Sequence, residues 1–233
     1  MIEIHDLNKT YDRKVVLEIP GLTIQKGESI GLVGNNGAGK TTLLRLILDL
    51  IKATNGIVNS GEINVAQSDH WKSYTGAFLD DNFLITFLKP IEYFEFVGKI
   101  HGLSRADIRE FLNENKLLFS EDVFNDKRFI RDLSKGNKNK VGILGAMINS
   151  PELIILDEPF ANLDPSSQQW LMTKLKSLND QGTTVIVSSH NLNQLSEISS
   201  RILLLENGKL IKDTENTTST LSELESYFRV QVS

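Results

Sequence analysis

The stretch GNNGAGKT, residues 34–41, places three glycines, a lysine and a threonine within eight positions. This spacing is typical of a phosphate-binding loop, whose glycine-rich backbone turns its N–H groups inward between a strand and a helix. The flanking sequence has the required order, because the apolar, strand-like SIGLVG (29–34) precedes the loop and TTLLRLILDL (41–50), with leucines at helical spacing, follows it. The stretch therefore predicts a site for a nucleoside triphosphate.

Each residue type in this loop has a physical task. The glycines let the backbone wrap a β-phosphate without an intruding side chain. Lys40 supplies a positive charge, Thr41 offers a hydroxyl to Mg²⁺, and the first helical turn presents unpaired N–H groups to the anion. A loop that only turned a corner would need neither the lysine nor the threonine. The predicted nucleotide-binding residues are Gly34, Asn35, Asn36, Gly37, Ala38, Gly39, Lys40, Thr41 and Thr42.

Composition limits the class of protein. A chain of 233 residues with 40% apolar content can form one large α/β domain or a domain with a subdomain. It has no cysteine, which excludes disulfides and thiolate metal sites and fits a reducing cytoplasm. The start MIEIHDLNKTY lacks a signal-peptide pattern, and no run reaches the roughly 18 apolar residues of a membrane span. We therefore expect a chain that is neither exported nor transmembrane.

The net charge of −5 argues against a nucleic-acid partner. Lys135, Lys138 and Lys140 nevertheless form one local basic cluster, for which a solvated helix face is the simplest interpretation. We expect no nucleic acid among the partners.

Hydrophobic patterning predicts an α/β core interrupted by helices. Short alternating segments in residues 1–30 indicate antiparallel strands, and NGIVNSGEINVA (55–66) carries two more strand candidates. From about residue 84 apolar residues recur at helical spacing, with Pro90 and Ser104 near helix starts. The predicted units are a core formed by 1–82 and 150–212, a helical subdomain at 83–149, and a C-terminal linker with a short helix at 213–233.

The second half of the core predicts parallel strands. PELIILDEP (151–159) and TTVIVSSH (183–190) are continuous apolar runs, separated by a helical pattern. Asn207-Gly208 within RILLLENGKLI signals a hairpin. The expected fold class is α/β: a P-loop NTPase core with a mainly parallel sheet, an N-terminal antiparallel β subdomain and an inserted α-helical subdomain.

An acidic pair ends the first of these apolar runs. At that place in a phosphate-loop enzyme Asp157 would hold the metal, directly or through water. Glu158 would point elsewhere and polarise the water that attacks the γ-phosphate. Taken alone, Asp-Glu-Pro is also the sequence of a strand that ends in solvent, and only the phosphate loop favours the catalytic interpretation.

His190 follows the buried run VIVSS and ends it abruptly. At the carboxyl end of a strand its imidazole can reach a γ-phosphate or the catalytic carboxylate. A structural histidine is the alternative. We predict that Glu158, His190 and Lys40 form the catalytic set.

Five motifs together indicate a family. The phosphate loop is followed by LSKGN (133–137), LIILDEP (153–159), NLDP (162–165) and SSH (188–190). Their order and spacing resemble the ATPase subunit of an ATP-binding cassette (ABC) transporter of the exporter type, over nearly the whole chain. The resemblance implies ATP as the nucleotide.

The resemblance assigns further residues to the nucleotide. Tyr11 matches the aromatic residue that stacks on adenine, with ordinary sheet packing as the alternative. Ser134 and Gly136 match the signature residues that bind the γ-phosphate of a nucleotide held by the opposite subunit. The N-terminus of a helix can bind an anion. By the resemblance, this anion is the γ-phosphate of a nucleotide that a partner subunit holds. The implied active unit is a head-to-tail ATP sandwich of two ATPase subunits, identical or different.

Three positions depart from the commonest family pattern. Lys135 stands for a glycine of the signature and Asn137 for its glutamine. In GAFLDDNFL (76–84), Asp80 takes the place of the glutamine that senses Mg²⁺, whereas Gln67 lies too early in the chain to substitute. The resemblance therefore makes Asp80 a third metal residue beside Thr41 and Asp157, and an acidic side chain changes the charge near Mg²⁺.

NLDP contributes Asp164, which by the resemblance lies at the dimer interface and couples the two sites. An aspartate that caps the helix starting near Pro165 is an equally good interpretation, and the two are compatible.

The expected function is ATP hydrolysis, with Mg²⁺, that drives export through a separate membrane permease at the cytoplasmic face of the cell membrane. The aromatic stretch FLITFLKPIEYFEFVGKIHGL (83–103) is a candidate for the permease groove, although core packing explains most of its rings. One alternative is an ATPase that remodels a protein or ribonucleoprotein complex. A second is a regulatory module with little turnover, which Asp80 and Asn137 favour and Glu158 and Lys40 oppose.

Overall fold

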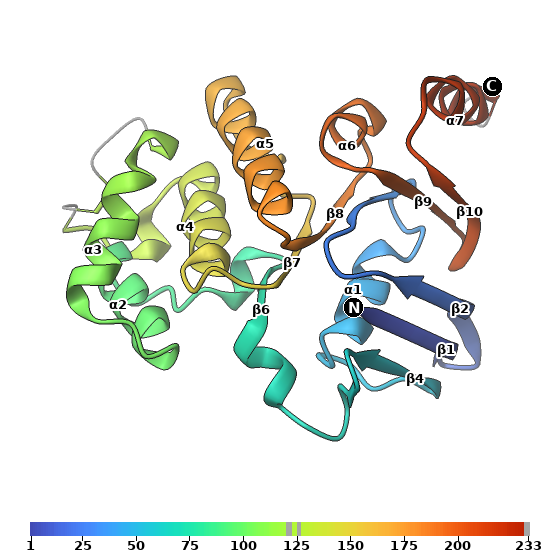
Figure 1. The fold of residues 1–233 in the computed structure, drawn as a ribbon, viewed down its shortest axis with the longest axis horizontal. Helices are drawn as coiled ribbons and strands as arrows, with labels where there is room; N and C mark the ends of the chain where they lie inside the picture. Colours follow the sequence, from blue (N-terminus) through green and yellow to red (C-terminus); the bar gives the residue numbers. More distant parts are fainter. Residues whose placement is uncertain (120–122, 125–126, 231–233) are drawn as a thin grey trace.

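The computed structural model describes residues 1–119, 123–124 and 127–230. In this part of the chain one 10-stranded sheet has the order β5-β4-β1-β2-β10-β9-β3-β8-β7-β6 (Figure 1). The strands are β1 (Ile2–Tyr11), β2 (Lys14–Ile24), β3 (Ser29–Val33), β4 (Asn55–Ser60), β5 (Ile63–Asn64), β6 (Thr75–Phe78), β7 (Leu153–Asp157), β8 (Thr184–Ser189), β9 (Arg201–Glu206) and β10 (Lys209–Glu215).

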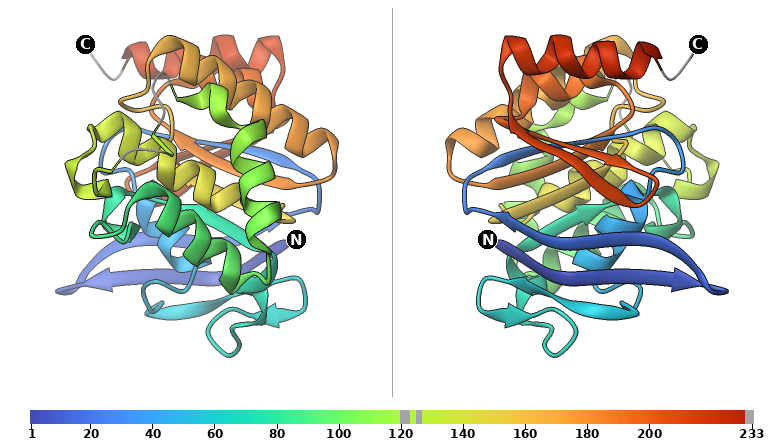
Figure 2. Two further views of the ribbon diagram at one scale, coloured as in Figure 1. Left: turned by 90° about the vertical axis from the view of Figure 1, so that its left-hand side faces the viewer. Right: turned by 90° about the vertical axis from the view of Figure 1, so that its right-hand side faces the viewer.

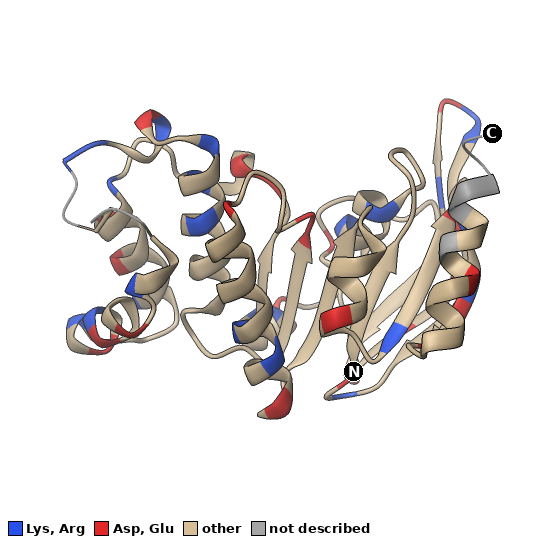
Figure 3. Cartoon of the chain, turned by 90° about the horizontal axis from the view of Figure 1, so that it is seen from above, with Lys and Arg blue, Asp and Glu red and all other residues tan. Residues whose placement is uncertain are grey.

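Helices cover both sides of this sheet. The α-helices are α1 (Lys40–Ile47), α2 (Pro90–Ile100), α3 (Arg105–Glu114), α4 (Lys135–Met147), α5 (Pro165–Asp180), α6 (Leu192–Ile198) and α7 (Thr218–Val230). Short 3-10 helices are η1 (His70–Tyr74), η2 (Asp81–Phe83), η3 (Lys116–Leu118) and η4 (Ile130–Asp132). Acidic and basic residues are interspersed over the helices in Figure 3.

The amino-terminal part is antiparallel, as predicted. β1 pairs with β2 on one side and with β4 on the other. Along β2 the apolar residues Leu17, Ile19, Leu22 and Ile24 are buried, because a strand with alternating hydrophobicity buries one face. These strands pack over α1 and share one hydrophobic core with it.

The central strands are parallel. β3 lies between β9 and β8, and β7 lies between β8 and β6. β3, β7 and β8 are buried along their whole length, which explains their continuous apolar sequences. Because parallel strands end at the same edge, the segments after β3, β7 and β8 meet there.

The inserted helices α2, α3 and α4 form the left part of Figure 1 and share a second core with α5, α6 and the opposite sheet face. Pro90 is the first residue of α2, and the Ser104 hydroxyl caps α3 by accepting from the Asp107 N–H. Both helix starts agree with the prediction.

The predicted boundary at residue 213 is wrong. β10 continues to Glu215, since its alternating residues pair with β9 up to Arg201. The Arg201 guanidinium also pairs with Asp213 at 2.6 Å. This pairing holds a polar sequence in a strand, so only residues 216 and 217 connect β10 to α7.

Helix α7 packs on α6 at the top of the molecule in both views of Figure 2. Leu224 is buried, and Leu221 and Tyr227, which lie three residues before and after it on the same helical face, pack against the same core. Phe228 has the helical spacing of the same face, but its side chain lies outside the part described. Among the described residues, no helix combines the length and apolarity needed to cross a bilayer.

Candidate functional site

The loop GNNGAGKT joins β3 to α1 at the carboxyl edge of the parallel strands (Figure 1). Gly37 and Gly39 have φ values of +83° and +107°. Residues that carry a side chain rarely adopt such backbone angles. Gly34 is restricted differently, because a Cβ there would overlap the Leu205 carbonyl oxygen. The glycines thus serve both turn geometry and close packing.

The β9–β10 turn supports the loop from outside, a contact that the sequence did not indicate. The Gly208 N–H donates to the Ala38 carbonyl oxygen at 2.9 Å. A Cβ on Gly39 would lie 3.4 Å from the Gly208 Cα. The predicted hairpin therefore also packs against the phosphate loop and supports its backbone.

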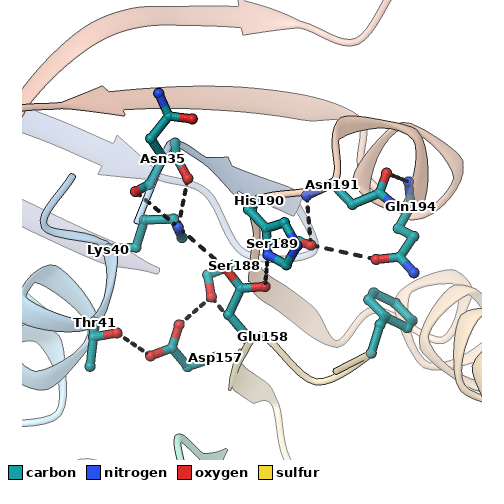
Figure 4. Close-up of polar contacts among 12 residues, drawn as sticks. Asn35, Lys40, Thr41, Asp157, Glu158, Ser188, Ser189, His190, Asn191 and Gln194 are labelled. Atoms are coloured by element: carbon teal, nitrogen blue, oxygen red, sulfur yellow. Dashed lines mark hydrogen bonds and ion pairs between the residues drawn. The ribbon is translucent and has the colours of Figure 1, made fainter. Parts of the chain in front are cut away.

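Lys40 is the first residue of α1 and is 6% exposed. Its Nζ donates to the Gly34 carbonyl oxygen at 2.6 Å and to that of Asn35 at 3.4 Å (Figure 4). The same Nζ lies 3.3 Å from Glu158 Oε1. The lysine therefore spans from the loop to the acidic pair after β7.

Thr41 and Asp157 face each other across the same edge. The Thr41 hydroxyl donates to Asp157 Oδ2 at 2.5 Å. The Ser188 hydroxyl, on β8, donates to Asp157 Oδ1 (Figure 4). Ser188 was not predicted as a site residue, since only its neighbour His190 carried a recognisable chemical group.

Glu158 has a strained backbone, with φ at +47°. Its N–H donates to the Ser188 hydroxyl at 2.9 Å, which fixes the turn that follows β7. Its Oε2 lies 2.9 Å from His190 Nδ1. Oε1 is buried and receives no hydrogen bond from the described part of the chain, although the Lys40 charge is close. A buried carboxylate oxygen without a donor is an acceptor available for chemistry.

His190 follows β8, as predicted, and its side chain is 63% exposed. The residues on either side of His190 are joined, because the Ser189 hydroxyl accepts from the Asn191 N–H at 3.0 Å. The Asn191 side chain in turn caps α6. The structure thus brings together all three predicted catalytic residues, Lys40, Glu158 and His190 (Figure 4).

Tyr11 ends β1 and is 47% exposed. With Val16 it lines a cavity of about 340 Å³ whose other walls are the phosphate loop and Glu158. Lys9 Nζ lies 4.5 Å from the centre of the ring. The exposed ring favours adenine stacking over ordinary sheet packing, and the stacking remains a prediction.

The LSKGN motif forms the start of α4. The Ser134 hydroxyl accepts from the Asn137 N–H at 3.3 Å and caps the helix. Gly136 faces the NLDP loop closely, since a Cβ would lie 2.6 Å from the Asn162 carbonyl oxygen. Asn139 Nδ2 donates to the Ala161 carbonyl oxygen at 2.9 Å. The two predicted dimer motifs therefore lie side by side.

Asp164 caps α5, accepting at Oδ1 from the Ser167 N–H at 2.9 Å. Its Oδ2 accepts from the buried Lys140 ammonium at 2.8 Å. This ion pair and the bonds from Ser166 and Ser167 hold the pKa of the Asp164 carboxyl far below its usual range. The capping interpretation is confirmed, and the interface role stays a prediction. Lys140 is buried in this pair and does not belong to a solvated face.

Asp80 lies just beyond β6 and caps η2, accepting at Oδ1 from the Asn82 N–H at 2.8 Å. Its Oδ2 accepts from Arg45 Nη2 at 3.3 Å. The structure thus gives Asp80 an ion pair with α1, and its metal role stays a prediction.

The family is shown by comparison with known proteins. The ABC transporter family model matches residues 17–161. SrtF of Streptococcus pyogenes, a lantibiotic transport ATP-binding protein, is 31% identical over 232 residues, which span 100% of this chain and 97% of SrtF. SkfE of Bacillus subtilis, the SkfA peptide export ATP-binding protein, is 32% identical over 219 residues, with 91% and 88% covered. The chain belongs to the ABC transporter family.

Solved structures agree with this assignment. A dimeric ATP-binding cassette in a post-hydrolysis state, bound to ADP and Pi, has a TM-score of 0.82 and 27% identity, over 93% of this chain and 99% of that one. Another dimeric ABC transporter cassette has a TM-score of 0.83 and 28% identity, with the same coverage. The predicted fold class and family are confirmed. The chain is an ATP-binding cassette ATPase of a transporter.

Proposed function

We propose that this chain hydrolyses Mg-ATP as one of two ATPase subunits attached to a membrane permease, and that it drives export from the cytoplasmic face of the membrane. The observation that carries the proposal is the meeting of Lys40, Glu158 and His190 beside the Thr41–Asp157 contact. Relatives named for lantibiotic transport and peptide export support export as the direction, with a peptide as the class of cargo.

The residues present fit the hydrolysis of a γ-phosphate. Lys40 is the buried cation of the loop and neutralises charge on the phosphates. Glu158 Oε1 receives no hydrogen bond from the described residues, so it is free to accept a proton from the attacking water. The water oxygen then bonds to the γ-phosphorus as the bond between the γ-phosphorus and ADP breaks. His190 fixes the carboxylate through Oε2 at 2.9 Å.

The Thr41 hydroxyl and the Asp157 carboxylate fit Mg²⁺, which prefers hard oxygen ligands. This ion usually keeps several waters and binds phosphate oxygens, so it needs few protein groups. The described residues hold no cluster of three or more His, Asp or Glu side chains suited to a metal, and such a two-residue site requires none. When bound, Mg²⁺ neutralises developing charge on the phosphates.

A second subunit completes the site in this proposal. Ser134 and Gly136 belong to a helix N-terminus that can bind an anion, and the exposed Ser134 lies at its cap. The dimeric cassettes of similar fold support a head-to-tail pair. Loss of the γ-phosphate would remove contacts between subunits and reopen the pair.

The permease has a candidate docking groove. An apolar cavity of about 210 Å³ lies between the end of α1 and the segment from η1 to η2; its lining is Leu48, Leu50, Trp71, Lys72, Thr75, Ala77, Leu79 and Phe83. Leu50 and Phe83 are half exposed there. Of the predicted stretch 83–103, only Phe83 lines this groove. Tyr93 and Phe94 are buried in the core, whereas Phe87 and Phe96 are exposed outside the groove.

A trapped dimer tests the proposal. Glu158→Gln should bind Mg-ATP and form a stable dimer, since the acceptor for the water proton is removed while Lys40 and Thr41 remain. We would tag this variant, load it with Mg-ATP, and capture partners from detergent-solubilised native membranes and from cytosol. A multi-span protein identified by mass spectrometry supports the permease.

Two results would count against the proposal. Capture of soluble proteins only would replace the transporter with a remodelling ATPase. Unchanged hydrolysis by Glu158→Gln would mean that another residue positions the water. Lys40→Ala serves as the control, because it should abolish both nucleotide binding and capture.

A further inference from the structure

The end of β1 carries a contact between a cation and a ring that the proposed mechanism does not use. Lys9 and Tyr11 are two residues apart on this strand, so their side chains can share one face. The Lys9 Nζ lies 4.5 Å from the centre of the Tyr11 ring. An ammonium group at this distance is attracted to the face of an aromatic ring. Among the lysines of the described chain, only Lys9 lies over this ring.

The segment that follows α1 holds this lysine in place. The Lys9 Nζ donates to the Lys52 carbonyl oxygen at 2.7 Å. The Thr54 N–H donates to the Asn8 carbonyl oxygen at 2.8 Å, and the Thr10 N–H donates to the Thr54 hydroxyl oxygen at 2.9 Å. Lys9 is therefore fixed at its own ammonium group and through the backbone on either side of it.

The ring belongs to the nucleotide cavity, whereas the lysine does not. Tyr11 is about half exposed and lines the cavity whose other walls include the phosphate loop. Lys9 is absent from that lining, so it contacts the ring from outside the cavity. Val16, which also lines the cavity, is an extra residue of β2 at the register shift between Lys9 and Thr10. Bulges of this kind re-aim side chains and are frequent next to active sites.

We propose that Lys9 is a positioning residue that fixes the Tyr11 ring in the orientation on which the base of the nucleotide stacks. The inference rests on the proposed function and deepens it at the base end of the ATP site. A half-exposed tyrosine has several rotamers, and a base that needs one of them binds more weakly by the fraction of time that the ring spends in the others. The ammonium group favours one orientation before the nucleotide arrives.

The same part of the chain would then position both ends of the nucleotide. Helix α1 begins at Lys40, beside the phosphate loop. Residues 52–54, which follow this helix, hold Lys9 and its neighbours. The distance between the phosphate loop and the ring is therefore set by one helix and the segment after it.

The test measures the affinity of the full chain for Mg-ADP by isothermal titration calorimetry. Lys9→Met keeps the apolar stem but removes the ammonium group, so it should weaken Mg-ADP binding by about three- to fivefold. Lys9→Arg should stay within about 1.5-fold of the wild type, because a guanidinium also stacks on aromatic faces and donates hydrogen bonds.

Lys14→Met is the matched control. Lys14 is exposed and lies directly opposite Tyr11 in the β1–β2 ladder, so its removal takes the same charge from the same end of the sheet. Its effect on Mg-ADP should be less than about 1.5-fold, because an exposed charge that makes no direct contact is screened. Equal losses in Lys14→Met and Lys9→Met would show that only the local positive charge matters, and the inference would fail.

A double variant and a ligand without a base show whether Lys9 acts through the ring. In the Tyr11→Ala background, Lys9→Met should have less than about a 1.5-fold effect, because the ring that it positions is missing. Pyrophosphate carries the diphosphate of ADP but no base, so its affinity, measured by displacement of Mg-ADP, should be equal in Lys9→Met and the wild type. Equal losses in both backgrounds, or a matching loss for pyrophosphate, would overturn the inference. So would an unchanged Mg-ADP affinity in Lys9→Met.

Failure of the proposed function gives a different result. If the wild-type chain binds no Mg-ADP, the phosphate-loop assignment is wrong and the inference falls with it. If Mg-ADP binds but Tyr11→Ala leaves its affinity unchanged, the phosphate loop stands and the base does not stack on this ring, so the inference falls alone. If Tyr11→Ala weakens binding while Lys9→Met is silent, only the role of Lys9 is wrong.

Discussion

A single carboxylate, that of Asp164, joins two helices of different parts of the fold. Its Oδ1 caps α5 through the Ser167 N–H, and its Oδ2 binds Lys140 of α4. The Lys140 side chain is only 4% exposed. A buried ammonium requires a negative partner, because its desolvation is otherwise uncompensated. The stability of α4 therefore depends on Asp164.

We expect Asp164→Asn to lower the free energy of unfolding by about 1–2 kcal/mol at pH 7. The asparagine still caps α5, so the loss reports mainly on the missing charge beside Lys140. Urea denaturation at pH 7 measures the difference from the wild type. An unchanged midpoint would mean that Lys140 finds another acceptor.

The same pair of proteins tests pH dependence. The pKa of Asp164 is lowered in the folded state, so its contribution is fully present above the unfolded value of about 3.9 and is lost as pH falls below it. The difference between wild type and Asp164→Asn should therefore be constant from about pH 7 to 5 and shrink below about pH 4. A constant difference down to pH 3 would contradict the assignment.

Sequence patterns located residues whose chemistry is local. Lys40 and Thr41 follow a glycine-rich loop, and Glu158 follows a strand, so their positions could be predicted. Ser188 and Arg45 could not, because their partners Asp157 and Asp80 are brought to them only by strand pairing. A serine or arginine without a local motif carries no such signal.

Elements were predictable where hydrophobicity decides them. The continuous apolar runs of β3, β7 and β8 and the Asn-Gly turn between β9 and β10 each have a strong local signal. β6 (TGAF) and the polar end of β10 have none, and they are strands because β7 and β9 supply pairing partners. Tertiary pairing overrode weak propensity at both places.

At the level of elements, α4 packs closely against the NLDP loop. Gly136→Ala would place a Cβ 2.6 Å from the Asn162 carbonyl oxygen, so the two must separate. Overpacking of this kind costs about 1–3 kcal/mol. We expect weaker ATP-driven dimerisation, measured by light scattering in the Glu158→Gln background, and unchanged ADP binding by the single chain.

Gly21→Ala is the matched control for this substitution. Its Cβ would have only one neighbour within 4 Å, the Ile4 carbonyl oxygen at 3.9 Å, and its φ is not positive. Dimerisation should be normal in Gly21→Ala. If Gly136→Ala dimerises equally well, the closeness of the two motifs has no role in assembly.

Over the whole molecule, helix α1 connects the proposed catalytic residues with the proposed docking groove. The proposed catalytic residues lie at the carboxyl edge of the parallel strands, where the loops after β3, β7 and β8 meet. The groove lies where the end of α1 meets the segment from η1 to η2. Helix α1 belongs to both, because it begins at Lys40 and ends beside Leu48. A partner bound in the groove would therefore lie one helix length from the phosphate loop.

This arrangement predicts that docking and hydrolysis can be separated. Leu50→Asp places a carboxylate in the apolar groove, where a partner would have to desolvate it, so capture of a multi-span protein by the trapped dimer should be lost. ATP hydrolysis by the isolated chain should stay within about twofold, because surface substitutions rarely disturb distant sites. Ile57→Asp is the control, since Ile57 on β4 is 44% exposed against 45% for Leu50 and lies outside the groove. Equal capture by both variants would place the permease contact elsewhere on the surface.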